Sequence, residues 1–224
     1  VSTYLFNFFT ANFTAESDQT GRKREGWLHW GVGLNLVMKN NINWSYFPKT
    51  DPIPQGLKEA INIFEKNFTK IDTITAEGII AKSSKKRKEI SEALESDDVL
   101  KILTQDFLDA NYKIETSKKR IDKIRVPVLF GEKGSTAQAF EPDGWNEENK
   151  IVLEIERGRA YANNQFLKDI FEASVMVNID YLVLAVSNLY KQSKDYEKIV
   201  GWLETIYTTN RIKLSLKGIL LIGY

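Results

Sequence analysis

The feature that most constrains the fold is an uninterrupted apolar run, Tyr181–Val186, with the sequence YLVLAV. Its length is that of a strand, yet it lacks the alternation of apolar and polar residues expected where one face meets water. A strand of this kind is covered on both faces, as in a sheet that packs between helices. The run therefore predicts an α/β fold with this strand inside the sheet.

Helical and strand patterns surround this run. Apolar residues recur at helical spacing, for example at Leu57, Ala60, Ile61 and Phe64. The same spacing predicts helices over 57–69, 99–110, 163–177 and 194–207. Shorter apolar stretches predict strands over 112–116, 126–131, 151–156 and 216–224. From residue 99 to residue 186, the predicted order is helix, strand, strand, strand, helix, strand.

The length of 224 residues suits one domain with a sizeable core. We divide it into an N-terminal helical and loop region over residues 1–96, a core over 97–190, and a C-terminal helix and strand over 191–224. Residues 1–50 place many aromatic side chains among glycines and asparagines. We expect irregular structure there, and we expect the whole region 1–96 to serve DNA recognition and packing.

Composition excludes several classes of protein. The 31 basic and 30 acidic residues give a formal net charge of +1, so only local clusters of charge could bind nucleic acid. The chain has no cysteine and a single histidine, His29, which argues against thiolate sites and histidine-based catalysis. No apolar run approaches the roughly 20 residues that span a bilayer, and the first residues lack a basic leader. We expect a cytoplasmic protein with no membrane partner.

Three acidic residues stand out between residues 143 and 156. Glu154 and Glu156 lie two positions apart on the predicted strand 151–156, so their side chains share a face. If Asp143 lies at the end of the neighbouring strand, three carboxylates converge on one place. Such a cluster is costly unless a hard cation neutralises it, and Mg²⁺ prefers oxygen ligands. The pattern favours metal-assisted hydrolysis of a phosphodiester.

Pro142-Asp143 followed by Glu154-Ile155-Glu156, on this order of elements, resembles the PD-(D/E)XK nucleases. The resemblance covers residues 97–190, and a similar Glu-x-Glu ending occurs in the BamHI-like branch of type II restriction endonucleases. It implies a restriction-endonuclease-like core, with a central mixed sheet flanked by helices. It also implies Mg²⁺-dependent cleavage of double-stranded DNA at a specific palindromic site by a homodimer. Mn²⁺ would be a substitute cation, and a DNA methyltransferase would be the companion protein.

The needs of phosphodiester hydrolysis give each acidic residue an expected role. Asp143 and Glu154 are expected to be metal ligands, with the carbonyl oxygen of Ile155 as a third ligand. Glu156, which replaces the family's usual lysine, is the expected general base for the attacking water. Glu115 is a further candidate acid, because the resembling nucleases have an upstream acid at this place.

Clusters of basic and amide side chains are the candidates for contact with DNA. One cluster lies just beyond the catalytic strand, at the start of a predicted helix, where free backbone N–H groups suit a phosphate. The candidate residues are Arg22, Arg24, Met38, Lys39, Asn40, Asn41, Lys85, Lys86, Arg87, Arg157, Arg159, Asn163 and Asn164.

These assignments have alternatives. Glu154 and Glu156 would be solvated if their strand lay at the edge of the sheet, paired there with Arg157 or Arg159. Glu115 would form an ordinary surface ion pair with one of the lysines near it, and the basic run 85–88 suits a solvated helix face. Two other functions remain open: a structure-specific or nonspecific repair nuclease on the same core, and a DNA-binding module whose catalytic site has decayed at Glu156.

Overall fold

The computed structural model describes residues 40–74, 95–116, 119, 122–158, 160–191 and 193–224. The chain divides into two compact units, Val1–Val37 and Met38–Tyr224, and every described residue belongs to the second unit. All that follows concerns this second unit.

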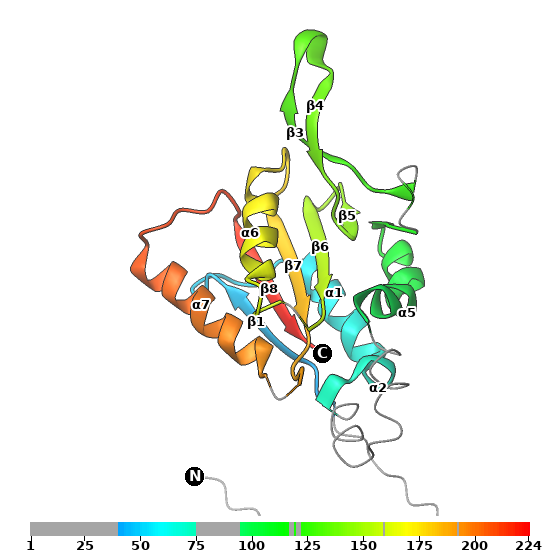
Figure 1. The fold of residues 1–224 in the computed structure, drawn as a ribbon, viewed down its shortest axis with the longest axis vertical. Coiled ribbons are helices and arrows are strands. Elements are labelled where there is room, and N and C mark those ends of the chain that lie inside the picture. The colour runs from blue at the N-terminus through cyan, green and yellow to red at the C-terminus, as the bar shows by residue number, and fades with distance from the viewer. Residues whose placement is uncertain (1–39, 75–94, 117–118, 120–121, 159, 192) are drawn as a thin grey trace, which may run out of the picture. The chain divides into compact units, whose positions relative to one another are not determined.

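A mixed six-stranded sheet lies at the centre of the unit, with the strand order β1-β8-β7-β6-β5-β2 (Figure 1). The strands are β1 (Asn43–Phe47), β2 (Lys113–Ile114), β5 (Gly144–Asn146), β6 (Ile151–Glu156), β7 (Tyr181–Val186) and β8 (Gly218–Gly223). β6, β7 and β8 run parallel, whereas β1 is antiparallel to β8, and β5 is antiparallel to both β6 and β2. The predicted α/β class is confirmed, and so are the strands 151–156 and 181–186.

Helices flank the sheet at the places that the apolar spacing predicts. They are α1 (Gln55–Lys66), α2 (Phe68–Ile71), α5 (Ser96–Asp109), α6 (Gln165–Val175) and α7 (Asp195–Thr209). The predicted helix 57–69 is divided at Asn67 between α1 and α2. Along the described residues, no helix combines the length and the apolar character needed to cross a membrane.

The alternation of side chains along β6 creates two cores, one on each face of the sheet. Ile151, Leu153 and Ile155 pack with buried residues of α1 and α5. Val152 packs on the opposite face, with buried residues of α6 and α7. Residues 182–186 of β7 are buried, and they contribute to both cores. The apolar run 181–186 is therefore a strand covered on both faces, as predicted.

One predicted strand lies outside the six-stranded sheet. β3 (Val126–Phe130) pairs with β4 (Thr136–Phe140) in a separate two-stranded sheet, whose tip is the short 3₁₀ turn η2 (Glu132–Gly134). Figure 1 shows this hairpin extending away from the main sheet. The prediction that 126–131 is the second core strand is wrong, because β5 occupies that place. β3 contains Pro127, which has no N–H to donate and is therefore suited to a short two-stranded ribbon rather than a central strand.

The N-terminal region contributes an edge strand that the sequence did not indicate. The prediction of irregular structure over 1–50 is wrong for β1, which pairs with β8 along its whole length. Its first residues, Asn43 and Trp44, are exposed and only Tyr46 and Phe47 are buried, so the strand has no clear alternation. Strands from residues 1–96, 97–190 and 191–224 thus join one sheet, while the division into those three regions stays a prediction.

Candidate functional site

The register of the sheet aligns Glu115, Asp143 and Glu154 on neighbouring strands. Gly144 of β5 pairs with the residue before Glu154 in β6 and with the residue before Glu115 in β2. Extending both pairings by one residue sets the three acids in a row, and the Glu115 N–H donates to the Asp143 carbonyl oxygen at 2.9 Å. The prediction that Asp143 lies at the end of the strand beside β6 is confirmed.

Glu154 and Glu156 lie on the face of β6 that α6 covers. β6 lies between β5 and β7, so the alternative of a solvated edge strand is wrong. Both side chains are partly buried. The Ile155 N–H donates to Asp143 Oδ2 at 2.8 Å, which fixes that carboxylate against the end of β6. The role of the Ile155 carbonyl oxygen as a metal ligand stays a prediction.

The structure adds a further acid, Asp169 of α6, which the sequence reasoning missed. Asp169 is 2% exposed, and one of its oxygens, Oδ1, accepts a hydrogen bond from Gln165 Nε2 at 3.2 Å. The other oxygen, Oδ2, is buried and has no hydrogen-bond partner among the described residues. A signal was present in the sequence, because Asp169 interrupts the apolar face that Phe166 and Ile170 define on this helix.

Burial raises the pKa of Asp143, Glu154, Glu156 and Asp169. The pKa is raised to about 6 for Asp143, about 7 for Asp169 and about 8 for Glu156, while that of Glu154 lies well above its ordinary value. Repulsion adds to burial, since Asp143 and Asp169 both raise the pKa of Glu154 and of Glu156. The site therefore disfavours four negative charges unless a positive charge joins them.

Two lysines border this acid cluster, which we define as Asp143, Glu154, Glu156 and Asp169. Lys123 forms an ion pair with Glu115 at 2.8 Å, and both side chains are largely buried. Glu115 is thus in an ion pair with a lysine, as the alternative held, but this pair is with Lys123 and is largely buried. On α6, Lys168 forms an ion pair with Glu172 at 3.1 Å, and its charge lowers the pKa of Glu156.

The described candidates for DNA contact differ in exposure. Arg157, directly after β6, is buried, and its charge lowers the pKa of Tyr224. Asn163 and Asn164 are exposed just before α6, and Asn164 has a φ of 55°, a left-handed conformation that asparagine tolerates well. For all three residues, contact with DNA stays a prediction.

Two further candidates contact the protein itself. The Asn40 side chain accepts a hydrogen bond from the Ile42 N–H, and Asn41 Nδ2 donates to Asp72 Oδ2 at 2.8 Å. These bonds hold the segment that leads into β1. The remaining candidates lie outside the described residues: Arg22, Arg24, Met38, Lys39, Lys85, Lys86, Arg87 and Arg159.

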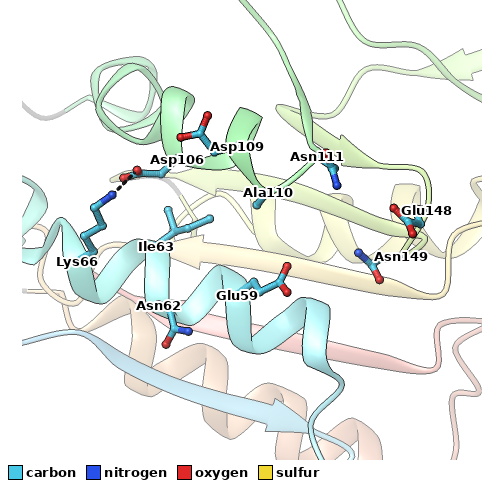
Figure 2. Close-up of a pocket in the computed structure, with 10 residues that line it drawn as sticks. All are labelled: Glu59, Asn62, Ile63, Lys66, Asp106, Asp109, Ala110, Asn111, Glu148 and Asn149. Atoms are coloured by element: carbon cyan, nitrogen blue, oxygen red, sulfur yellow. Dashed lines mark hydrogen bonds and ion pairs between the residues drawn. The ribbon is translucent and has the colours of Figure 1, made fainter.

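A separate polar pocket of about 680 Å³ lies between α1, α5 and the turn from β5 to β6 (Figure 2). Lys66 and Asp106 form an ion pair of 2.6 Å at one end of it. The lining residues are Glu59, Asn62, Ile63, Lys66, Asp106, Asp109, Ala110, Asn111, Glu148 and Asn149. It shares no residue with the acid cluster, and it is formed by the helices that cover the other face of the sheet.

The acid cluster is not a preformed metal cage. Among the described residues, no group of three or more His, Cys, Asp or Glu side chains is arranged to hold a metal ion. Mg²⁺ usually takes one or two protein carboxylates and fills its other positions with water and substrate phosphate. Carboxylate donors on adjacent strands and an unpartnered buried oxygen on Asp169 fit such an open site.

Comparisons of the chain with protein-family models, with curated proteins and with solved structures found no match.

Proposed function

We propose that the chain is a type II restriction endonuclease, which hydrolyses double-stranded DNA at a specific palindromic site with Mg²⁺ and acts as a homodimer. The observation that carries the proposal is the acid cluster: the Asp143 carboxylate accepts a hydrogen bond from the Ile155 N–H beside β6, and Asp143 and Asp169 both raise the pKa of Glu154 and of Glu156 by electrostatic repulsion.

The arrangement of elements supports the same proposal. Among the described residues, α5, β2, β5, β6, α6 and β7 follow one another in the order helix, three strands, helix, strand, and the β3–β4 hairpin with its 3₁₀ turn lies between β2 and β5. β2, β5 and β6 are antiparallel neighbours, and β7 returns parallel to β6 after α6. This order and the positions of Asp143, Glu154 and Glu156 resemble the restriction-endonuclease-like core.

The residues divide the work of hydrolysis between them. Asp143 and Glu154 would hold the cation, which supplies Lewis-acid stabilisation of the charge that develops on the phosphate. Glu156 would accept a proton from the attacking water, since it shares the face of Glu154 and its raised pKa makes it a stronger base than an exposed glutamate. Glu115, paired with Lys123, would support Asp143 from the next strand.

The first test is incubation of the protein with a long linear duplex of known sequence, with Mg²⁺ in one sample and EDTA in another. Discrete fragments that require Mg²⁺ are the expected result, and their ends give the recognition site. A smear would favour the nonspecific or structure-specific repair nuclease instead. Absence of cleavage together with a salt-sensitive mobility shift would favour the DNA-binding module.

Two conservative variants test the assigned metal ligands. Asp143→Asn and Glu154→Gln should each abolish cleavage while DNA binding stays measurable. The matched control is Glu147→Gln, because Glu147 is an exposed glutamate that pairs with Lys113 at 2.8 Å outside the cluster. Cleavage at the wild-type rate by either cluster variant would contradict the assignment.

A further inference from the structure

We infer that Lys123 binds a phosphate group of the DNA at the edge of the acid cluster, with its ammonium group held in place by Glu115. The inference rests on the proposed function. It gives the site a basic residue that neither the sequence pattern nor the resemblance assigns, and it makes Glu115 the residue that positions this lysine.

Contacts between atoms place Lys123 beside the acid cluster. Its Nζ is 2.8 Å from each of the two carboxylate oxygens of Glu115. The Glu115 N–H in turn donates to the Asp143 carbonyl oxygen at 2.9 Å, so these two residues lie opposite each other on antiparallel strands. Opposite residues of such strands have their side chains on one face of the sheet. The ammonium group is therefore bonded to a side chain on the face that carries Asp143 and Glu154.

The burial of this ion pair asks for an explanation other than stability. The side chains of Lys123 and Glu115 are only 23% and 11% exposed. Taking two charges out of water costs about as much as their attraction returns, so a buried ion pair is weak evidence of stabilisation. Lys168 provides a contrast, because it is 57% exposed and pairs with Glu172 one turn away, as is common on the surface of a helix.

The ammonium group of Lys123 keeps a donor for a ligand. A lysine has three N–H donors and no acceptor. Two of them suffice for the two oxygens of Glu115, and among the described residues Nζ has no other hydrogen-bond partner. Because the side chain is still partly exposed, the third donor can meet an anion from solution. Phosphate is an anion that lysine commonly binds in proteins.

The charge of the site favours a phosphate of the substrate as this anion. A phosphodiester is negatively charged, so the carboxylates of the acid cluster repel it. Lys123 sets the opposite charge at their edge: burial is the main cause of the raised pKa of Asp143, and the charge of Lys123 opposes that rise. A phosphate bound to Lys123 could therefore lie next to the acid cluster with part of the repulsion offset.

The variants have to separate the charge of Lys123 from the loss of its partner. Lys123→Gln alone would leave Glu115 buried without a cation, which is costly. The double variant Glu115→Gln, Lys123→Gln removes both charges, whereas Glu115→Gln alone keeps the ammonium group. The matched control is Lys66→Gln, Asp106→Asn, which neutralises an ion pair of 2.6 Å on the helices that cover the other face of the sheet. Both double variants leave the net charge of the chain unchanged.

The test is the affinity for a labelled linear duplex, measured by fluorescence anisotropy in EDTA at a series of salt concentrations. Each phosphate contact contributes about 0.9 to the slope of log K against log salt concentration. We expect the wild type, Glu115→Gln and the control to share one slope. The double variant at Glu115 and Lys123 should have a slope smaller by about 0.9. Circular dichroism checks that each variant is folded.

The outcomes separate the inference from the proposed function. Equal slopes for Glu115→Gln and the double variant would show that Lys123 touches no phosphate, and a wild type that cuts DNA with Mg²⁺ would still support the proposed function. The inference would also be wrong if the control lost as much slope as the double variant. A wild type that neither binds nor cuts DNA would overturn both proposals. Should the double variant not fold, Glu115→Gln, Lys123→Met replaces it with the same expected slope, because methionine keeps the apolar stem of the lysine.

Discussion

Glu156 has two properties that bear on its role: it adds a negative charge at the end of β6, and it is partly buried, with the nearby acids Asp169 and Asp143 raising its pKa. A lysine would offset negative charge at this position, whereas glutamate adds to it. The cluster is therefore under electrostatic strain when no cation is bound, and this strain should be measurable in the stability of the protein.

The metal-free protein should lose stability as the pH rises. Folding raises the pKa of Glu156 from 4.5 to about 8 and that of Asp169 from 3.8 to about 7. Between the ordinary and the raised values the folded chain binds more protons than the unfolded chain, so the free energy of unfolding falls as the pH increases through this window. Urea unfolding in EDTA, from about pH 5 to about pH 8, should show this decline.

Glu156→Gln is the matching variant for this measurement. Because glutamine does not ionise, the decline with pH should be smaller than in the wild type by about 1 kcal/mol or more, given about 1.4 kcal/mol for each unit of pKa shift. Mg²⁺ should restore stability to the wild type at the upper end of the range. Equal slopes for the two proteins would show that Glu156 ionises freely in the folded state.

The same variant tests the role of Glu156 as general base. Cleavage by Glu156→Gln should be slower by about 10²-fold or more, the usual contribution of general base catalysis, while DNA binding is retained. The rate is measured in single-turnover cleavage of a duplex that carries the recognition site, with Glu147→Gln as the control. A wild-type rate would assign proton transfer to another group.

The place of a residue in the cluster could be predicted from the sequence where it depends on residues nearby in the chain. Glu154 and Glu156 share a face because of strand alternation, which their spacing alone fixes. Asp143 could be placed beside them because only a short turn separates β5 from β6. Asp169 could not, since its place in the cluster depends on how α6 packs across β6, which a non-local contact determines.

At the scale of elements, the β3–β4 hairpin has a buried base and an exposed outer part. Val126 is fully buried and packs in the core that α6 and α7 share, whereas Leu129 and Phe130 are 56% and 55% exposed. The base of the hairpin should therefore contribute to stability, and its outer residues should not.

Two variants test this division within β3. Val126→Ala should lower the free energy of unfolding by about 1.5–3 kcal/mol, the value of burying a valine side chain. The double variant Leu129→Ser, Phe130→Ser should change it by less than about 0.5 kcal/mol, as exposed positions usually do. Urea unfolding of both proteins gives the comparison. A large loss in the double variant would mean that the outer hairpin is covered by something in solution.

The elements that the sequence predicted well have a clear pattern of apolar residues within their own length. α1, α5, α6 and α7 each place apolar residues along one face, and β6 and β7 are long enough to show their patterns. β5 has three residues, too few for any period to appear, and two of the five residues of β1 are exposed. These two strands owe their place to pairing with β6 and β8 rather than to local preference.

At the scale of the whole unit, Tyr224 connects parts of the chain that are distant in sequence. Its ring is fully buried and stacks on Phe64 of α1, with centroids 6.2 Å apart. Its hydroxyl donates to the Glu156 carbonyl oxygen at 3.2 Å, and its own carbonyl oxygen accepts from the Asn188 N–H at 2.8 Å and from the Thr73 hydroxyl. The ends of β6, β7 and β8 are thus joined to the helices of the N-terminal region beside the acid cluster.

Two substitutions at Tyr224 separate the contribution of the ring from that of the hydroxyl. Tyr224→Ala leaves a cavity between α1 and the sheet and should lower the free energy of unfolding by about 3–5 kcal/mol. Tyr224→Phe keeps the ring and should cost about 1 kcal/mol, because it removes a single hydrogen bond. If the bond to the Glu156 carbonyl also holds the end of β6 in place, Tyr224→Phe should slow DNA cleavage more than a variant of equal stability elsewhere, such as a substitution in the β3–β4 hairpin. Equal rates in the two variants would show that the Tyr224 hydroxyl contributes to stability but not to cleavage. The position of Glu156 would then be set by the pairing of β6 with β5 and β7.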